Sequence, residues 1–339
     1  MNSLLEISNL SIGIRRGAKL LSSVEDVSFK INQGEILGIV GESGSGKSLT
    51  ALSITGLLGT GKAVSSGSIF YNRADGAPAR INLLDIPESS LEAIRGKEIS
   101  MVFQEPFSSL NPLMKIGKQI AETLVLHENR ELDGGEKRES INDQVRQVLR
   151  RLGFTDPEKL VNAYPHQLSG GMCQRAMIAL AVICRPRLII ADEPTTALDR
   201  ATQAGILSFL RDIYRDFGSS ILFISHDLSL VRNFCSRVLV MYSGRILEEG
   251  DTEEVFLHPE HEYTRSLLGA IPGQANRGKD LANIPGRIPS LEEGRPAGCP
   301  FHPRCGKALP ACREEFPRAR PCPGSQSHIS RCLFAGGPA

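Results

Sequence analysis

The stretch GESGSGKSLT at residues 41–50 places three glycines and three serines around one lysine, directly after the apolar run 36–40. Its spacing fits GxxxxGK[ST], a loop whose backbone N–H groups surround phosphate oxygens. Glycine is needed because side chains would block the phosphate. We expect the lysine to reach the β and γ phosphates and the serine after it to ligate Mg²⁺. The predicted ligand is a nucleoside triphosphate, bound by Gly41, Ser43, Gly44, Ser45, Gly46, Lys47, Ser48 and Leu49.

A second acidic motif, RLIIADEPTTALD at residues 187–199, begins as a buried strand and ends in Asp192 and Glu193. At the carboxyl edge of a parallel sheet, Asp192 can hold Mg²⁺ and Glu193 can polarise an attacking water. The alternative is that the two acids simply enter a solvated turn. Together with the phosphate loop, the motif predicts hydrolysis as well as binding.

The segment LSGGM at residues 168–172 places Ser169, Gly170 and Gly171 before the helical run 173–183. A helix N-terminus of this kind is a second site for an anion. One chain does not easily bring its own two phosphate sites around a single nucleotide, whereas a head-to-tail pair of chains does. Cys173 follows the motif, where a helix N-terminus can acidify a thiol. The alternative is that Cys173 is a small tolerated residue.

The elements around these motifs predict an α/β fold. Residues 3–40 alternate apolar and polar residues with turns at 16–17 and 32–34, which indicates an N-terminal antiparallel sheet. Residues 106–165 are helical and charged, with 128–142 expected as a solvated loop or helix end, so we predict an inserted helical subdomain at about 105–167. Further strands are expected at 68–71 and 99–103. Strand-like runs at 188–191, 221–224 and 238–241 are separated by helical segments, as in a mostly parallel sheet.

Composition and charge exclude some classes of protein. The chain has 339 residues, with 39 Lys+Arg against 38 Asp+Glu, so no global basic field indicates nucleic-acid binding. We find no apolar run of about 18 residues that could span a bilayer. The N-terminus lacks the basic start and apolar core of a signal peptide, so we expect a cytoplasmic chain.

The ordered motifs resemble those of ATP-binding cassette (ABC) transporter ATPases over roughly residues 3–255. The resemblance includes Walker A at 41–48, LSGGM, the Walker B segment 188–192 with Glu193, ALD at 197–199 and SHD at 225–227. It implies that Gln104 senses the γ-phosphate and Mg²⁺, and that His226 contacts the γ-phosphate. Asp199 would communicate across a dimer, and residues 169–171 would close on ATP held by the opposite subunit. The implied Mg²⁺ ligands are Ser48, Gln104 and Asp192, with Glu193, His226 and Gln104 as the catalytic set. Where the family commonly stacks an aromatic residue on adenine, this chain has Ile14.

After residue 253 the chain changes character, and we place a domain boundary near 256, between an ATPase domain at 1–255 and an extension at 256–339. The extension resembles the C-terminal region of ATPases that serve oligopeptide, dipeptide and nickel importers. In that family it helps two ATPase subunits associate, and in some members its cysteines hold an iron-sulfur cluster. The resemblance points to a [4Fe-4S] cluster on Cys299, Cys305, Cys312 and Cys332, with Cys322 as an extra.

The spacing of these cysteines matches neither CxxC zinc sites nor a common ferredoxin run, so zinc, free thiols and disulfides stay open as alternatives. We expect His302 to pack or to be solvated and not to act as a ligand. A thiol-rich cytoplasmic segment favours metal ligation over disulfides, and its role would be structural.

The resemblance implies the ATPase subunit of a membrane importer of di- or oligopeptides, peripheral on the cytoplasmic face of the inner membrane. Its implied partners are a second ABC ATPase subunit in a heterodimer, two membrane-spanning permease subunits and an extracytoplasmic solute-binding protein, with no nucleic acid. Nickel or another small solute is an alternative cargo. The alternative from another class is a non-transport ABC ATPase acting on nucleic acid or ribosomes. Such proteins usually have two cassettes or a long coiled coil, and this chain has one cassette and no sustained heptads.

Overall fold

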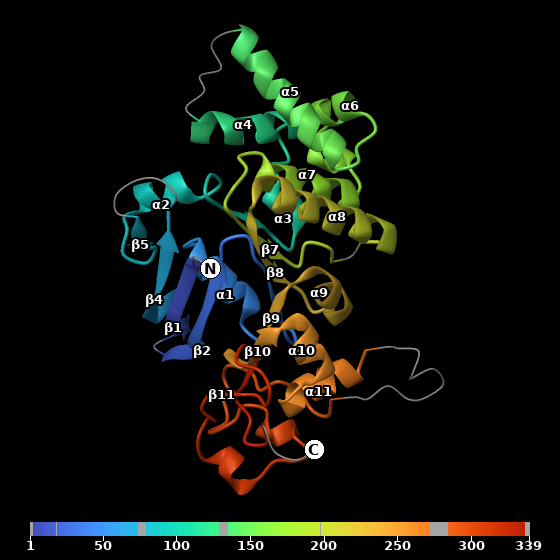
Figure 1. Cartoon of the computed structure of the whole chain (residues 1–339). Coiled ribbons are helices and arrows are strands. Elements are labelled where there is room, and N and C mark those ends of the chain that lie inside the picture. The colour runs from blue at the N-terminus through green and yellow to red at the C-terminus, as the bar shows by residue number, and fades with distance from the viewer. Residues whose placement is uncertain are drawn as a thin grey trace. The chain divides into compact units, whose positions relative to one another are not determined.

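The computed structural model of the chain describes residues 3–17, 19–73, 79–128, 135–196, 198–271 and 284–335. It contains two compact units, each made of segments that are distant in sequence (Figure 1). The first unit comprises Asn32–Glu35 and Asp85–Leu222, and the second comprises Asn2–Ile31, Ile36–Leu84 and Phe223–Ala339. None of the helices described is both long enough and apolar enough to cross a bilayer.

The strands of the first unit carry the acidic motif. β6 (Ile99–Val102) pairs in parallel with β7 (Leu188–Asp192), and β8 (Ser220–Ile224) is the next strand in this sheet. Every residue of the three strands is buried, as expected for parallel strands covered on both faces. β7 therefore delivers Asp192 to the carboxyl edge of the sheet.

Helices make up the rest of the first unit. α8 (Arg200–Phe217) shows why they form: its buried Ile206, Phe209, Leu210 and Ile213 follow the helical period, and Gly218 ends it in the left-handed region. The other helices described are α2 (Glu88–Ile94), α3 (Pro106–Ser109), α4 (Ile116–Glu128), α5 (Gly135–Arg151), α6 (Pro157–Asn162), the 3-10 turn η1 (Pro165–Gln167) and α7 (Gly170–Val182).

Residues 128–142, expected as a solvated loop or helix end, contain the start of a long helix. α4 ends at Glu128, residues 129–134 lie outside the described part of the chain, and α5 begins at Gly135. The buried Ile141, Val145 and Leu149 are four residues apart, so they form one apolar stripe along α5. The predicted helix end agrees with the start of α5 in this stretch, and Val145 and Leu149 lie in the part of 106–165 that was predicted to be helical.

The second unit begins with an antiparallel sheet in the order β2-β1-β4-β5. β1 (Ser3–Arg16) pairs antiparallel with β4 (Lys62–Asn72), which pairs antiparallel with β5 (Arg80–Asn82), and β2 (Lys19–Asn32) lies beside β1. Alternating apolar residues of β1, such as Leu5 and Ile7, are buried, which is the period-two pattern of a sheet with one covered face. The N-terminal antiparallel sheet was predicted correctly.

A second sheet of this unit carries the phosphate loop. β3 (Ile36–Val40) pairs in parallel with β9 (Arg237–Tyr242), and β9 pairs antiparallel with β10 (Arg245–Asp251). The C-terminal strands β12 (Ile329–Ser330) and β11 (Arg320–Pro321) continue it beyond β10. The helices are α1 (Lys47–Ile54), α9 (Leu228–Phe234), α10 (Thr252–Leu257), α11 (Glu262–Gly269) and the 3-10 turns η3 (His302–Arg304) and η4 (Pro310–Arg313). The extension thus adds strands to this sheet, which its lack of periodicity did not indicate.

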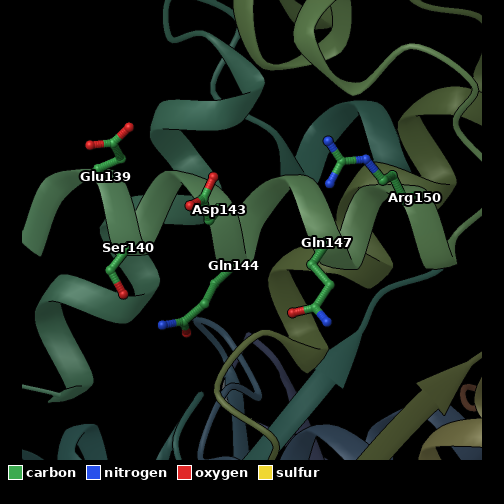
Figure 2. A pocket seen from close by; sticks show the side chains of 6 residues that line it. All are labelled: Glu139, Ser140, Asp143, Gln144, Gln147 and Arg150. Atoms are coloured by element: carbon green, nitrogen blue, oxygen red, sulfur yellow. The ribbon is translucent and has the colours of Figure 1, made fainter. Parts of the chain in front are cut away.

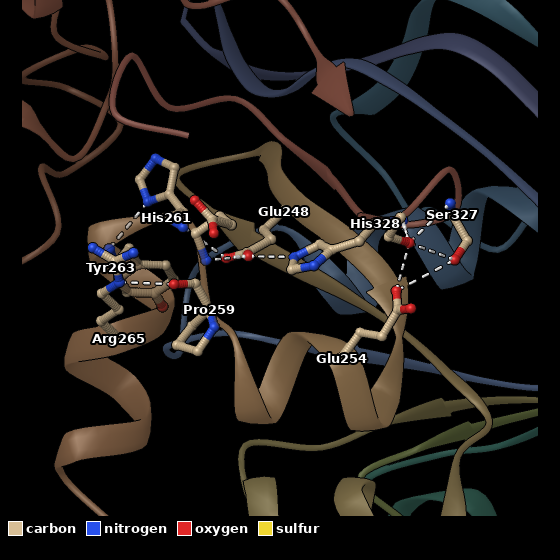
Figure 3. A network of polar contacts seen from close by, with 10 residues as sticks. Glu248, Glu254, Pro259, His261, Tyr263, Arg265, Ser327 and His328 are labelled. Atoms are coloured by element: carbon tan, nitrogen blue, oxygen red, sulfur yellow. Dashed lines mark hydrogen bonds and ion pairs between the residues drawn. The ribbon is translucent and has the colours of Figure 1, made fainter. Parts of the chain in front are cut away.

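A buried carboxylate joins the extension to this sheet. Glu248 on β10 is 1% exposed and accepts hydrogen bonds from the backbone N–H groups of Glu260 and His261, at 2.6 and 3.0 Å. His328, immediately before β12, places its Nε2 2.7 Å from the same carboxylate (Figure 3). One buried side chain therefore ties together β10, the start of α11 and the last described strand.

An aromatic cluster supplies the apolar part of this junction. Tyr242, Tyr263 and Phe301 are all buried, with ring centroids 4.6 to 5.4 Å apart in edge-on or tilted contacts. Because Tyr263 and Phe301 belong to the extension and Tyr242 to β9, the cluster packs the loop-rich C-terminal segment against the sheet.

We predict that His328→Ala destabilises the protein by about 3 kcal/mol, because it leaves the buried Glu248 carboxylate without its side-chain partner. The measurement is urea unfolding followed by circular dichroism. Arg287→Ala is the matched control, since Arg287 pairs with Glu293 in an exposed ion pair worth less than about 1 kcal/mol. Equal unfolding midpoints for the two variants would contradict the role of the buried pair.

Candidate functional site

The predicted phosphate loop has the backbone of an anion-binding nest. It leaves β3 at Gly41 and enters α1 at Lys47, and Gly41, Gly44 and Gly46 have φ values of 151°, 80° and 98°. A Cβ atom on Gly41 would lie 2.1 Å from the Met241 carbonyl oxygen, so no larger residue fits there. Gly41 is therefore needed for the close approach of the loop backbone to β9 as well as for ligand access.

Lys47 lies under this loop. It is 5% exposed, and its Nζ donates hydrogen bonds to the carbonyl oxygens of Gly41 and Glu42 at 2.8 and 3.0 Å. Ser45 is fully buried, and its N–H donates to the Glu42 carbonyl at 3.2 Å. Ser48 and Leu49 follow in the first turn of α1, whose N-terminus carries partial positive charge. An anion at the loop would therefore meet an ammonium, backbone donors and a helix N-terminus.

His226 belongs to the same unit as this loop. It is exposed on the turn after β8, and the N–H of the preceding Ser225 donates to the Ile39 carbonyl of β3 at 3.2 Å. Asp227 fixes the other side of the turn, because its carboxylate accepts from the N–H groups of Ser229 and Leu230 at the start of α9. His226 therefore lies on a turn that hydrogen bonds hold on both sides, next to β3, the strand that leads into the phosphate loop.

The acidic motif and the predicted glutamine meet in the first unit. Asp192 ends β7 and is 4% exposed. The Gln104 amide Nε2 lies 3.3 Å from Oε2 of Glu193, and the Thr196 hydroxyl donates to the same oxygen at 2.9 Å. Glu193 has a φ of 48°, a conformation that costs a non-glycine residue on the order of 1 kcal/mol. Gln104 and Glu193 are therefore in contact, as expected of two residues that act on one reaction.

The LSGGM segment forms a capped helix N-terminus. Ser169 caps α7 by accepting a hydrogen bond from the Met172 N–H at 3.3 Å, and Ser169 and Gly170 are exposed. A Cβ on Gly171 would touch Leu198 at 3.4 Å, so the segment before Asp199 packs against this motif. The arrangement can present backbone N–H groups to an anion.

Asp199 caps the neighbouring helix. Its carboxylate accepts from the Thr202 hydroxyl at 2.6 Å and from the N–H groups of Ala201 and Thr202 at 3.0 Å. These hydrogen bonds, led by the one from the Thr202 hydroxyl, lower the pKa of Asp199. Ala197, in the same ALD motif, lies outside the described residues.

Cys173 is not an activated thiol. Its side chain is 0% exposed, its Sγ donates to the Pro165 carbonyl at 3.6 Å, and burial raises its pKa. Burial overrides the influence of the helix N-terminus, so the small tolerated residue is the correct alternative. Ile14, the residue at the expected adenine position, is half-buried on β1 opposite Lys62.

The cysteines of the extension fall into two groups. Burial, and then the neighbouring thiols of Cys332, Cys312 and Cys305, raise the pKa of Cys299 to about 12. Burial also raises the pKa of Cys322 to about 12, but the charges that act on this thiol are those of Glu248 and other carboxylates. The four predicted ligands are therefore electrostatic neighbours, and Cys322 lies in a different environment.

The cysteines of the extension are not arranged as ligands of a metal ion. Across the described part of the chain, no set of three or more His, Cys, Asp or Glu side chains is arranged to hold a metal ion. The structure therefore does not support a cluster or zinc site. His302 is half-buried, with Nδ1 2.9 Å from the Cys299 carbonyl oxygen, in agreement with a packing role.

A polar pocket on the first unit contains none of the predicted site residues. It lies along α5 and is lined from that one helix (Figure 2). The lining residues are Glu139, Ser140, Asp143, Gln144, Gln147 and Arg150.

Sequence reasoning missed one residue of the phosphate loop, Glu42, and two residues that contact it, Tyr263 and Arg304. Glu42, Tyr263 and Arg304 form hydrogen bonds with one another or with the loop backbone, although 221 and 262 positions separate Tyr263 and Arg304 from Glu42. The only local signal was the HPRC segment at 302–305, which contains Arg304.

Comparison with protein families gives two matches that cover different parts of the chain. The family model "ABC transporter" matches residues 24–196, which include the loop, LSGGM, Asp192 and Glu193. The model "Oligopeptide/dipeptide transporter, C-terminal region" matches residues 247–312.

Individual relatives match over nearly the whole length. The chain is 42% identical over 323 residues to the oligopeptide transport ATP-binding protein OppD of Salmonella typhimurium, covering 95% of this chain and 92% of the relative. It is 42% identical over 313 residues to the oligopeptide transport ATP-binding protein AppD of Bacillus subtilis, covering 92% and 91%. Among solved structures, a dimeric ATP-binding cassette in a post-hydrolysis state bound to ADP and Pi superposes with a TM-score of 0.63 at 29% identity, covering 73% of this chain and 98% of that one.

We predict that Gly41→Ala weakens ATP binding at least about tenfold, because the new methyl group displaces the loop from the Met241 carbonyl. Gly44→Ala is the matched control: it also has a positive φ, but its Cβ would meet no atom within 4 Å. Isothermal titration calorimetry measures both affinities, and circular dichroism confirms folding. Equal losses in the two variants would show that φ strain, and not the close approach, governs the loop.

Proposed function

This chain belongs to the ABC transporter family, and on that premise we propose that it is the ATP-hydrolysing subunit of a membrane importer of di- or oligopeptides. The observation that carries the proposal is the glycine nest at 41–48 with Lys47 buried beneath it. The match of the C-terminal segment to the oligopeptide/dipeptide region, and relatives that are oligopeptide transport ATP-binding proteins, supply the class of cargo.

The phosphate loop binds ATP in this proposal. Its backbone N–H groups and Lys47 contact the β and γ phosphates, and Lys47 then exchanges loop carbonyls for phosphate oxygens. By family expectation the hydroxyl of Ser48, the Asp192 carboxylate and Gln104 would hold Mg²⁺, which would offset the charge of the phosphates. The side-chain oxygens of these three residues are the donors that Mg²⁺ prefers.

Hydrolysis depends on the orientation of Glu193. The Gln104 amide and the Thr196 hydroxyl both contact one of its oxygens, which fixes the direction in which the carboxylate can accept a proton from water. His226 donates to the γ-phosphate, and its braced turn keeps the imidazole in place. Each group acts by position, because phosphoryl transfer needs alignment and charge stabilisation more than covalent chemistry.

A second ATPase subunit completes the machine. We propose that Ser169, Gly170 and Gly171 bind the nucleotide held by that subunit. Asp199 communicates across the interface between the two subunits. Their support is the exposed, capped N-terminus of α7 and the dimeric form of a structurally similar cassette. By family expectation the pair is a heterodimer.

The remaining partners are two permease subunits and an extracytoplasmic solute-binding protein, with the chain peripheral on the cytoplasmic face of the inner membrane. Residues 105–167 expose large apolar side chains that could contact a permease: Phe107, Leu113 and Leu126 are 53%, 86% and 68% exposed. Exposed apolar side chains of this size are typical of protein contact surfaces. We assign them to a helical subdomain at about 105–167, within an ATPase domain at 1–255.

The extension at 256–339 would support association of the subunits and hold a metal centre on Cys299, Cys305, Cys312 and Cys332. This finer proposal rests on the match of residues 247–312 to the oligopeptide/dipeptide C-terminal region and on the contact of two of these cysteines, since the Cys299 N–H donates to the Cys312 carbonyl at 2.9 Å. The four sulfurs would have to move before they could coordinate a metal ion, because no three or more potential ligands in the described part of the chain are grouped to hold one. A [4Fe-4S] cluster is the first candidate and zinc the second.

We predict that Glu193→Gln binds ATP normally but hydrolyses it at least about a hundredfold more slowly, because the amide cannot accept the proton of the attacking water. ATP-bound dimers should therefore accumulate, which size-exclusion chromatography with the partner subunit measures. Lys47→Ala is the control that should lose ATP binding itself. Unchanged turnover in Glu193→Gln would remove this residue from its role.

We predict that anaerobically purified protein contains iron and sulfide, and that Cys312→Ser removes them because the site loses one of four ligands. Elemental analysis and an optical spectrum measure the content per chain. Cys322→Ser is the matched control and should keep the metal. A folded wild-type protein without iron or zinc would refute the metal centre and leave the ATPase proposal intact.

A further inference from the structure

We propose that Arg304 of the C-terminal extension is a positioning residue for the phosphate loop, through which the extension sets the affinity for ATP. The inference rests on the proposed function in one respect, namely that the loop binds a nucleotide. It concerns a contact between the second residue of the loop and the HPRC segment of the extension.

Arg304 reaches the loop through an ion pair that is buried on the arginine side only. Its Nη1 lies 2.9 and 3.0 Å from the two carboxylate oxygens of Glu42, and its side chain is 6% exposed. The same nitrogen lies 3.2 Å from the Tyr242 hydroxyl. The other nitrogens bind backbone, with Nε donating to the Pro285 carbonyl at 2.8 Å and Nη2 to that of Ile284 at 3.4 Å. All three guanidinium nitrogens are used, which lysine cannot reproduce.

Glu42 is held at each of its polar groups. Its carbonyl accepts from Lys47 and Ser45 within the loop, at 3.0 and 3.2 Å. Its backbone N–H donates to the hydroxyl of the buried Tyr263 on α11 at 2.9 Å, and its carboxylate pairs with Arg304. Two of the three constraints on this loop residue therefore come from beyond residue 255.

Charge gives the contact a consequence for binding. The Glu42 side chain is 30% exposed and lies in the segment that receives a triphosphate, where an uncompensated carboxylate repels the ligand. Arg304 offsets this charge, and because the pair is largely desolvated, removal of the arginine leaves Glu42 without its cation. The pair thus acts on the loop both by charge and by fixing its backbone.

The extension also reaches the other end of the loop. Arg295 is 10% exposed and forms an ion pair with Glu25, while its Nε donates to the Ser243 carbonyl at 2.6 Å. The next residue, Gly244, donates its N–H to the Ser45 carbonyl at 2.9 Å. The loop is therefore supported on both sides by arginines of the extension, directly at Glu42 and through one turn at Ser45.

The test measures the affinity of the full chain for ATP by isothermal titration calorimetry. Arg304→Ala should weaken ATP binding about tenfold and Arg304→Lys by less, since lysine keeps the charge but not the geometry. Arg287→Ala, which removes an exposed arginine of the same extension, should bind ATP like the wild type. If Arg304→Ala melts at a lower temperature but binds ATP as tightly as the wild type, the residue is only structural and the proposal is overturned.

A double-mutant cycle with Glu42→Gln separates charge compensation from general loosening. Without the carboxylate, loss of Arg304 should weaken ATP binding by less than about threefold, so the two substitutions should be non-additive. Additive effects would overturn the proposal. Failure of the proposed function gives a different result, because the wild-type chain would then fail to bind ATP or would bind it as tightly as Lys47→Ala.

Discussion

A loop that receives phosphate on its backbone N–H groups must be held in place by contacts that leave those groups available. In this chain the constraint falls on a few residues of the second unit. Gly41 approaches the Met241 carbonyl too closely for any Cβ, Ser45 accepts from Gly244, and Glu42 is fixed by its neighbours. Lys47, the residue expected to contact the phosphates, itself donates hydrogen bonds to the carbonyl oxygens of Gly41 and Glu42. The close approach of β3 and β9 is therefore a condition for the binding site.

The first unit meets a related demand by capping. Ser169 and Asp199 each satisfy N–H groups at a helix start, which orders the two motifs expected to face another subunit. Glu193 is held differently, by two donors and a strained backbone directly after a buried strand. Buried parallel strands provide the rigid base, so small polar segments at their ends can keep one orientation without a large apolar contact of their own.

The extension shows how a segment with few apolar residues becomes part of a folded unit. It cannot form a large core, so it uses a buried carboxylate, a three-ring aromatic cluster and two short strands added to an existing sheet. Arginines 295 and 304 then face inward, where their charges meet Glu25 and Glu42. The extension, which contains the five clustered cysteines, is thereby connected to the phosphate loop.

The sequence by itself determined the motifs, the class of ligand and the antiparallel and parallel sheets, because loop spacing, strand periodicity and cap residues are local properties. Only the tertiary structure showed that the Cys173 thiol is not activated, since burial, and not its place at a helix start, controls its pKa. The same holds for Arg304 and Tyr263, which meet Glu42 across more than 220 positions. Such contacts depend on how strands are ordered in a sheet, and no local pattern of residues specifies that order.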